Sequence, residues 1–84
     1  MGRIIYSEAT RSRFREDVLL ALDALARECG DVEICPPNPS GSPFWEVAVI
    51  ATGQNRRRWS VHGVTLAEAA GRMAAWKGVE VRPN

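Results

Sequence analysis

Residues 44–76, FWEVAVIATGQNRRRWSVHGVTLAEAAGRMAAW, decide the fold of this chain. Segments 44–52 and 57–63 each alternate in side-chain character with a period of two, which predicts β-strands. TGQNRR between them favours a turn, so we expect a hairpin. The indoles of Trp45 and Trp59 lie on the same face only if odd-numbered positions of one strand pair with odd-numbered positions of the other. This register requires a loop with an odd number of residues, either 54–56 or 52–56. The residues expected on that buried face are Trp45, Val47, Val49, Ala51, Trp59 and Val61.

The end of this stretch predicts a helix that begins after Thr65. T-L-A-E at 65–68 is a capping box, in which Thr65 caps the first turn and Glu68 reaches back. Lys77 suits the negative end of the helix dipole, and Gly78 is a left-handed terminator. Gly71 costs roughly 1 kcal/mol relative to Ala inside a helix, and we expect it to allow close approach to the sheet. A hydrophobic staple is expected between Val64 and Ala69, and the apolar stripe comprises Leu66, Ala69, Ala70, Met73 and Trp76.

The N-terminal part predicts a short strand at 3–6 and then a long amphipathic helix. The helix is expected to begin at Ser7 or Thr10, either of which can cap it, and to end at Gly30. Its apolar stripe comprises Phe14, Val18, Ala21, Leu22, Leu25 and Cys29. On its solvent-facing side we expect the ion pairs Arg13 with Asp17 and Asp23 with Arg27.

Three further segments connect or close the domain. In Asp31–Cys35 apolar and polar side chains alternate, which predicts a strand. PPNPSGSP at 36–43 excludes a helix or a central strand, and we favour a connector over a recognition loop. Residues 79–81 alternate again and suggest a short closing strand.

The predicted order is helix, three strands, helix, with a short strand at each terminus. We therefore expect a two-layer α+β domain, with an antiparallel three-stranded sheet and both helices on one face. This order resembles that of the double-stranded-RNA-binding domain, and the final strand–strand–helix is similar to small antitoxin domains. The RNA-binding family carries lysines at the start of its second helix and a histidine in its first inter-strand loop. Residues 65–68 contain no lysine and residues 36–43 contain no histidine. The resemblance therefore extends to the order of helices and strands and not to the residues with which that family contacts RNA.

Composition and charge narrow the class of protein. The 84 residues predict one domain, 1–84, and the formal net charge is +1. Residues 1–15 carry +3, residues 16–55 carry −6 and residues 56–84 carry +4, a distribution compatible with a two-sided surface. No run reaches the length of a membrane span and no leader is recognisable, so we expect a soluble, cytoplasmic protein without membrane contact.

The sequence offers little for catalysis, metals or cofactors. Cys29 and Cys35 lack CxxC spacing, and we expect free, half-buried thiols, with a disulfide as the alternative. His62 is the only histidine, and Ser60 lies roughly 6.5 Å along the strand from it, beyond hydrogen-bond reach. There is no nucleophile elbow, glycine-rich phosphate loop or ligand cluster in the sequence. We therefore expect a protein that is not an enzyme and that has no metal or cofactor.

Two surfaces are candidates for binding a partner. Arg56, Arg57 and Arg58 form the densest cationic cluster, which can grip nucleic acid or an acidic protein, or can act as a solvated turn. The sheet face away from the helices is the second candidate, with Ala48, Ile50 and Phe44 exposed inside a polar rim. That rim comprises Glu46, Arg58, Ser60 and His62.

The leading hypothesis is a non-catalytic interaction module for a protein or nucleoprotein partner, in the manner of a small phage or mobile-element inhibitor or adaptor. The alternative is a nucleic-acid-binding domain that uses arginines at the N-terminus and the hairpin tip. A monomer and a homodimer are both compatible with the sequence. The residues proposed to contact a partner are Arg56, Arg57, Arg58, Glu46, Ile50, His62, Arg11, Arg13 and Arg15.

Overall fold

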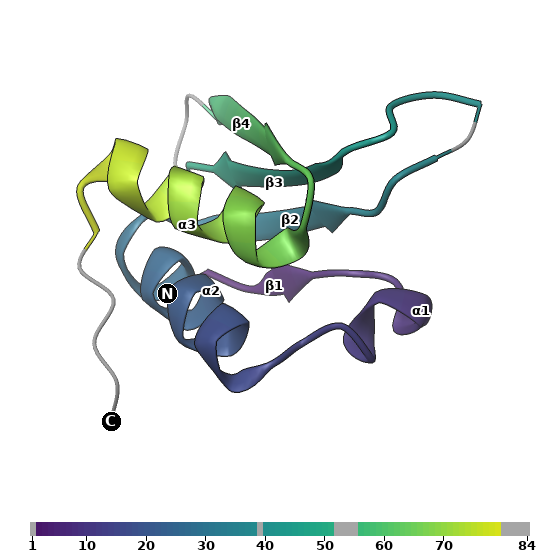
Figure 1. Cartoon of the computed structure of the whole chain (residues 1–84). Helices are drawn as coiled ribbons and strands as arrows, with labels where there is room; N and C mark the ends of the chain where they lie inside the picture. The colour runs from purple at the N-terminus through teal and green to yellow at the C-terminus, as the bar shows by residue number, and fades with distance from the viewer. Residues whose placement is uncertain (1, 39, 52–55, 80–84) are drawn as a thin grey trace.

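The computed structural model describes residues 2–38, 40–51 and 56–79, which form an α+β fold (Figure 1). A mixed β-sheet lies against the two longer helices, α2 and α3, which pack on the same face of the sheet and against each other. The elements in chain order are β1 (Ile4–Ile5), α1 (Glu8–Arg11), α2 (Glu16–Glu28), β2 (Asp31–Cys35), β3 (Trp45–Ile50), β4 (Arg58–Gly63) and α3 (Leu66–Lys77).

The sheet has four strands in the order β1-β2-β3-β4, which corrects the predicted three-stranded antiparallel sheet. β2, β3 and β4 form the expected antiparallel meander, and the short strand expected near the N-terminus pairs in parallel with β2. A parallel pair requires a crossover between its strands, and α1 and α2 supply it. A two-residue strand shows no measurable alternation, so the sequence revealed neither its partner nor its direction. Of the expected closing strand, Val79 packs against the core outside any strand, and 80–81 lie outside the described residues.

The hairpin register is the predicted one, with Val47 opposite Val61 and Val49 opposite Trp59. The Ala51 N–H donates to the Arg57 carbonyl at 2.9 Å, which continues the ladder past the strand ends. Both indoles, Trp45 and Trp59, are half-buried and pack against the core on the helix side of the sheet. The burial of one face therefore fixes the register, as expected.

The predicted first helix is two helices, which is a second correction. α1 ends at Arg11, and α2 begins at Glu16 after an extended N-cap at Arg15. The break allows the Phe14 ring to meet Tyr6 edge-on, with centroids 4.9 Å apart, and to pack against the core. Because Arg13 precedes α2, it does not share a helix face with Asp17. The ion pairs found among the described residues include neither Arg13–Asp17 nor Asp23–Arg27.

Helix α3 has the predicted ends. The Thr65 hydroxyl accepts a hydrogen bond from the Glu68 N–H at 3.0 Å, and Gly78 adopts the left-handed conformation with φ 68°. The Glu68 carboxylate, however, pairs with Arg72 at 2.7 Å along the same helix.

Three expectations for the surface of α3 are wrong. Gly71 faces solvent, and a Cβ built there has nothing within 4 Å. Val64 is 68% exposed and Trp76 is 56% exposed, so neither the staple nor the end of the stripe is buried. α3 packs on β3, β4 and α2, and its buried residues, Leu66, Ala69, Ala70, Met73 and Ala74, include neither end of the expected apolar surface.

The core lies between the sheet and the two longer helices. Leu22 and Leu25 of α2, Met73 of α3 and Val32 of β2 are among its fully buried side chains. Both cysteines are free thiols, as favoured from the sequence. None of the helices in ranges 2–38, 40–51 and 56–79 is long and apolar enough to cross a lipid bilayer.

Candidate functional site

The sheet has one face that none of the described helices covers, and we call it the open face. Strand alternation and the observed register determine which side chains lie on it. One cross-strand row holds Asp31, Ile50 and Arg58, the next holds Ile5, Glu33, Ala48 and Ser60, and the third holds Cys35, Glu46 and His62.

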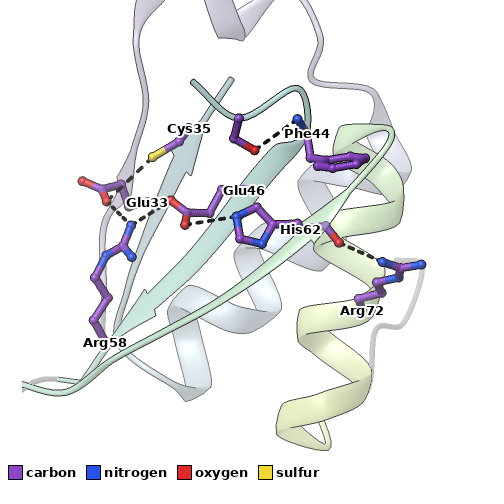
Figure 2. Close-up of polar contacts among 8 residues, drawn as sticks. Glu33, Cys35, Phe44, Glu46, Arg58, His62 and Arg72 are labelled. Carbon is purple, nitrogen blue, oxygen red and sulfur yellow. Dashed lines mark hydrogen bonds and ion pairs between the residues drawn. The ribbon is translucent and has the colours of Figure 1, made fainter. Parts of the chain in front are cut away.

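An arginine of the edge strand β4 reaches across the open face and binds two carboxylates from different strands (Figure 2). The Arg58 Nη2 lies 2.9 Å from Glu33 Oε1 and 3.0 Å from Glu46 Oε2. Ala48 stands opposite Glu33 in the register and is fully buried, so the expectation that it would be exposed on this face was wrong. The charged side chains thus cover the small residue and hold one another in place.

The charges in this network shift one another's pKa. Burial alone raises the pKa of Glu46, but hydrogen bonds from Arg58 and Cys35 and the charges of Arg58 and His62 reverse this, so the net pKa is lowered. The hydrogen bonds to Glu33 and Glu46 raise the pKa of Arg58. Both shifts favour the charged forms of Glu46 and Arg58.

The Cys35 thiol lies beside the same carboxylates. Its Sγ is 3.9 Å from Glu33 Oε1. Burial, a hydrogen bond to Glu46 and the negative charges of Glu33 and Glu46 raise the pKa of Cys35 to about 11. Since the thiolate is the reactive form, Cys35 is a poor nucleophile at neutral pH.

His62 lies at the rim of the open face, near the end of β4. Its Nε2 is 3.5 Å from Glu46 Oε1, and half of its side chain is exposed. Its backbone carbonyl accepts a hydrogen bond from Arg72 Nη1 at 2.9 Å, as Figure 2 shows. The hydrogen bonds among the described residues do not join His62 to Ser60, so the two lack the geometry of a nucleophile and its base.

The arginines of the hairpin are mostly engaged within the chain. Arg58 belongs to the network, and Arg56 Nη2 lies 3.8 Å from Asp31 Oδ2. Arg57 is exposed and uses its carbonyl in the sheet ladder. Two of the three side chains therefore neutralise acids of the sheet.

The N-terminal arginines lie at the other end of the sheet. Arg13 and Arg15 line a hollow of about 510 Å³ together with Trp45, and Arg13 and Trp45 also border a second hollow of about 380 Å³. Arg11 is exposed at the end of α1. A six-residue strand spans about 17 Å between its first and last Cα, so the structure separates the two arginine clusters.

Several residues on and beside the open face were not predicted from the sequence as site residues. Glu33 and Cys35 lie on the open face because side chains alternate along β2, and this alternation is visible in the sequence. Val64 and Arg72 line a hollow of about 290 Å³ with Phe44, which is 45% exposed. Their proximity depends on how α3 lies against β4, which no local pattern encodes.

Within the described ranges, no group of three or more His, Cys, Asp or Glu side chains is placed to hold a metal ion. The chain matches no protein-family model, and searches of curated proteins and of solved structures give no match.

Proposed function

We propose that this protein is a non-catalytic interaction module that binds a protein partner through the open face. The observation that supports this most directly is the Glu33–Arg58–Glu46 network on a sheet face free of described helices. Side chains already held by ion pairs lose less conformational freedom on binding than free ones. The surface is therefore partly ordered before a partner arrives.

The chemistry of the open face favours a protein partner. Ile50 is half-buried and Phe44 at the start of β3 is exposed, which gives apolar contact area beside a polar rim. The acids Asp31, Glu33 and Glu46 of the open face outnumber Arg58 on it and Arg56, which pairs with Asp31, so these five side chains have a formal charge of −1. A phosphate backbone would be repelled there, whereas a partner that presents basic and apolar groups would be attracted.

A module of this kind acts by occupying a surface of its partner. We propose the role of a small inhibitor or adaptor in the cytoplasm, of the type found in phages and mobile elements. Such a role requires no catalytic group and is compatible with the neutral Cys35 thiol.

The test is affinity capture from the native host with matched variants. Ile50→Lys adds one cation to the open face, and Leu19→Lys places the same change on α2, where Leu19 is 38% exposed. We expect wild type and Leu19→Lys to retain the same partner and Ile50→Lys to lose it, with all three folded by circular dichroism. Equal retention of that partner by both variants would refute the assignment to the open face.

The alternative is a nucleic-acid-binding domain, and one observation favours it. Arg13 and Arg15 border the same hollow as Trp45, which combines cations with an aromatic ring. Fluorescence anisotropy with labelled DNA and RNA across salt concentrations tests this. Binding that weakens steeply with salt and is lost in Arg13→Glu together with Arg15→Glu would support it. Binding that is absent at low salt would exclude it.

A further inference from the structure

The strand β4 forms one edge of the sheet, and its hydrogen-bonding groups face outward. In an antiparallel ladder the hydrogen-bonded pairs alternate, and the Ala51–Arg57 bond identifies the odd-numbered residues as those bonded to β3. The N–H and C=O groups of Arg58, Ser60 and His62 therefore point away from the sheet. The Arg72–His62 bond agrees with this, because it reaches the His62 carbonyl from outside.

Among the residues that the structure describes, this edge has few of the usual protections against pairing. The opposite edge, β1, has two residues, and a very short edge strand is one such protection. β4 has six residues, pairs continuously with β3 and contains no proline. Its one charged side chain, Arg58, is held by Glu33 and Glu46 on the open face. Among the described groups, only the His62 carbonyl is capped.

An exposed aromatic side chain borders the same edge on the helix side. Arg72 and Trp76 are four residues apart, so they lie on one side of α3, and Arg72 reaches the outer side of β4. Trp76 is 56% exposed, and Lys77 lies over both Trp59 and Trp76, 4.0 Å and 6.0 Å from their ring centroids. The free edge therefore adjoins apolar surface as well as unpaired backbone groups.

We propose that this protein forms a twofold-symmetric homodimer in which β4 pairs antiparallel with β4 of a second copy. The strand is complementary to itself about Ser60. Pairing Ser60 with its equivalent places Trp59 opposite Val61 of the other copy, and the same contact occurs twice. Aromatic and β-branched residues opposite one another on adjacent strands stabilise a sheet.

The layer of helices also fits this dimer. α3 packs on β3 and β4, so two copies of α3 would be separated by two strand spacings. At about 4.8 Å per strand this is about 10 Å, close to the usual distance between packed helices. Trp76 would then lie in the seam between the two helices.

Electrostatics do not oppose the association. The net charge of each chain is +1, so two copies repel only weakly. In this register Arg58 stands opposite His62 of the other copy, which lies beside that copy's Glu46. Among the β4 side chains, like formal charges do not meet directly across the seam when histidine is neutral. Arg72, which caps the His62 carbonyl from outside, must release or share that carbonyl for the Arg58 N–H of the other copy to bond there.

Sedimentation velocity across a range of concentrations tests the dimer. We expect wild type to reach twice the monomer mass of 9.3 kDa. Ser60→Pro removes an outward N–H and leaves the bonds to β3 intact, so it should remain folded and monomeric. Ser60→Thr, the matched control, should remain dimeric.

Crosslinking tests the register and does not depend on the proline variant folding. In a background with Cys29→Ser and Cys35→Ser, Ser60→Cys should form a disulfide between copies, detected by mass spectrometry after mild oxidation. Opposed residues in an antiparallel pair have Cα atoms about 5.5 Å apart, within the range that a disulfide spans. A wild type that stays monomeric at all concentrations, a folded Ser60→Pro that stays dimeric, or an absence of the crosslink would each overturn the proposal.

Discussion

Two glycine substitutions test the placement of α3 against the sheet, with opposite expected signs. Gly71 lies inside α3 and faces solvent, and a Cβ added there has nothing within 4 Å. Gly71→Ala should therefore raise the free energy of unfolding by about 0.5–1 kcal/mol, because alanine loses less backbone entropy and introduces no clash. Gly63 is buried at the end of β4, and its Cβ would lie 2.6 Å from the Ala69 nitrogen and 3.1 Å from the Thr65 carbonyl oxygen.

The neighbours of Gly63 are backbone atoms at the start of α3, so they cannot move aside as a side chain would. Gly63→Ala should lower the free energy of unfolding by about 1–3 kcal/mol, the usual cost of overpacking. Urea denaturation followed by circular dichroism measures both values, and thermal unfolding should show shifts of about 4–8 °C per kcal/mol for a chain of this size. A destabilising Gly71→Ala would mean that Gly71 faces the sheet. A neutral Gly63→Ala would mean that α3 begins farther from β4 than the structure places it.

Three other predictions concern the open face. The pKa of Glu46 is lowered in the fold, so its contribution to stability is present above its unfolded pKa, near 4.5, and is lost as the pH falls through the folded value. Urea denaturation as a function of pH should show this loss, and Glu46→Gln should flatten it; an identical slope in both proteins would contradict the assignment. Arg58→Ala should destabilise the fold by about 0.5–1 kcal/mol and Arg57→Ala by less, because only Arg58 bridges two carboxylates and the pairs are partly exposed. Thermal melts compare the two, and equal effects would show that the network contributes nothing. The pKa of the Cys35 thiol, raised to about 11, should make its alkylation by iodoacetamide slow at neutral pH and much faster in strong base; rapid labelling near pH 7, located by mass spectrometry, would show a different environment.

The separation of the two arginine clusters bears on both proposed functions. From the sequence alone, the nucleic-acid-binding alternative uses two arginine clusters, Arg11, Arg13 and Arg15 at the N-terminus and Arg56 to Arg58 at the hairpin tip. In the structure Arg56 and Arg58 pair with Asp31, Glu33 and Glu46, Arg57 is exposed, and the N-terminal arginines lie at the far end of the sheet. A nucleic-acid-binding function would therefore depend on the N-terminal cluster alone, which gives the two functional tests different target residues.

Only part of the candidate site could be predicted from the sequence. Glu46, Ile50, Arg58 and His62 were assigned to one face because strand residues alternate strictly between faces. Their mutual contacts, and the inclusion of Glu33, required the order and register of β2 beside β3. Alternation assigns a residue to a face, but only the pairing of strands determines its neighbours.

The amino-acid sequence by itself determined the elements that depend on neighbours along the chain. These are the β3–β4 register, fixed by the apolar positions of Trp59 and Val61, and the ends of α3, fixed by Thr65 and Gly78. Tertiary structure alone decided the break between α1 and α2, the parallel pairing of β1 and the exposure of Trp76. Local propensity and capping energies act within a few residues, whereas these features depend on which distant surfaces meet and how much of each they bury.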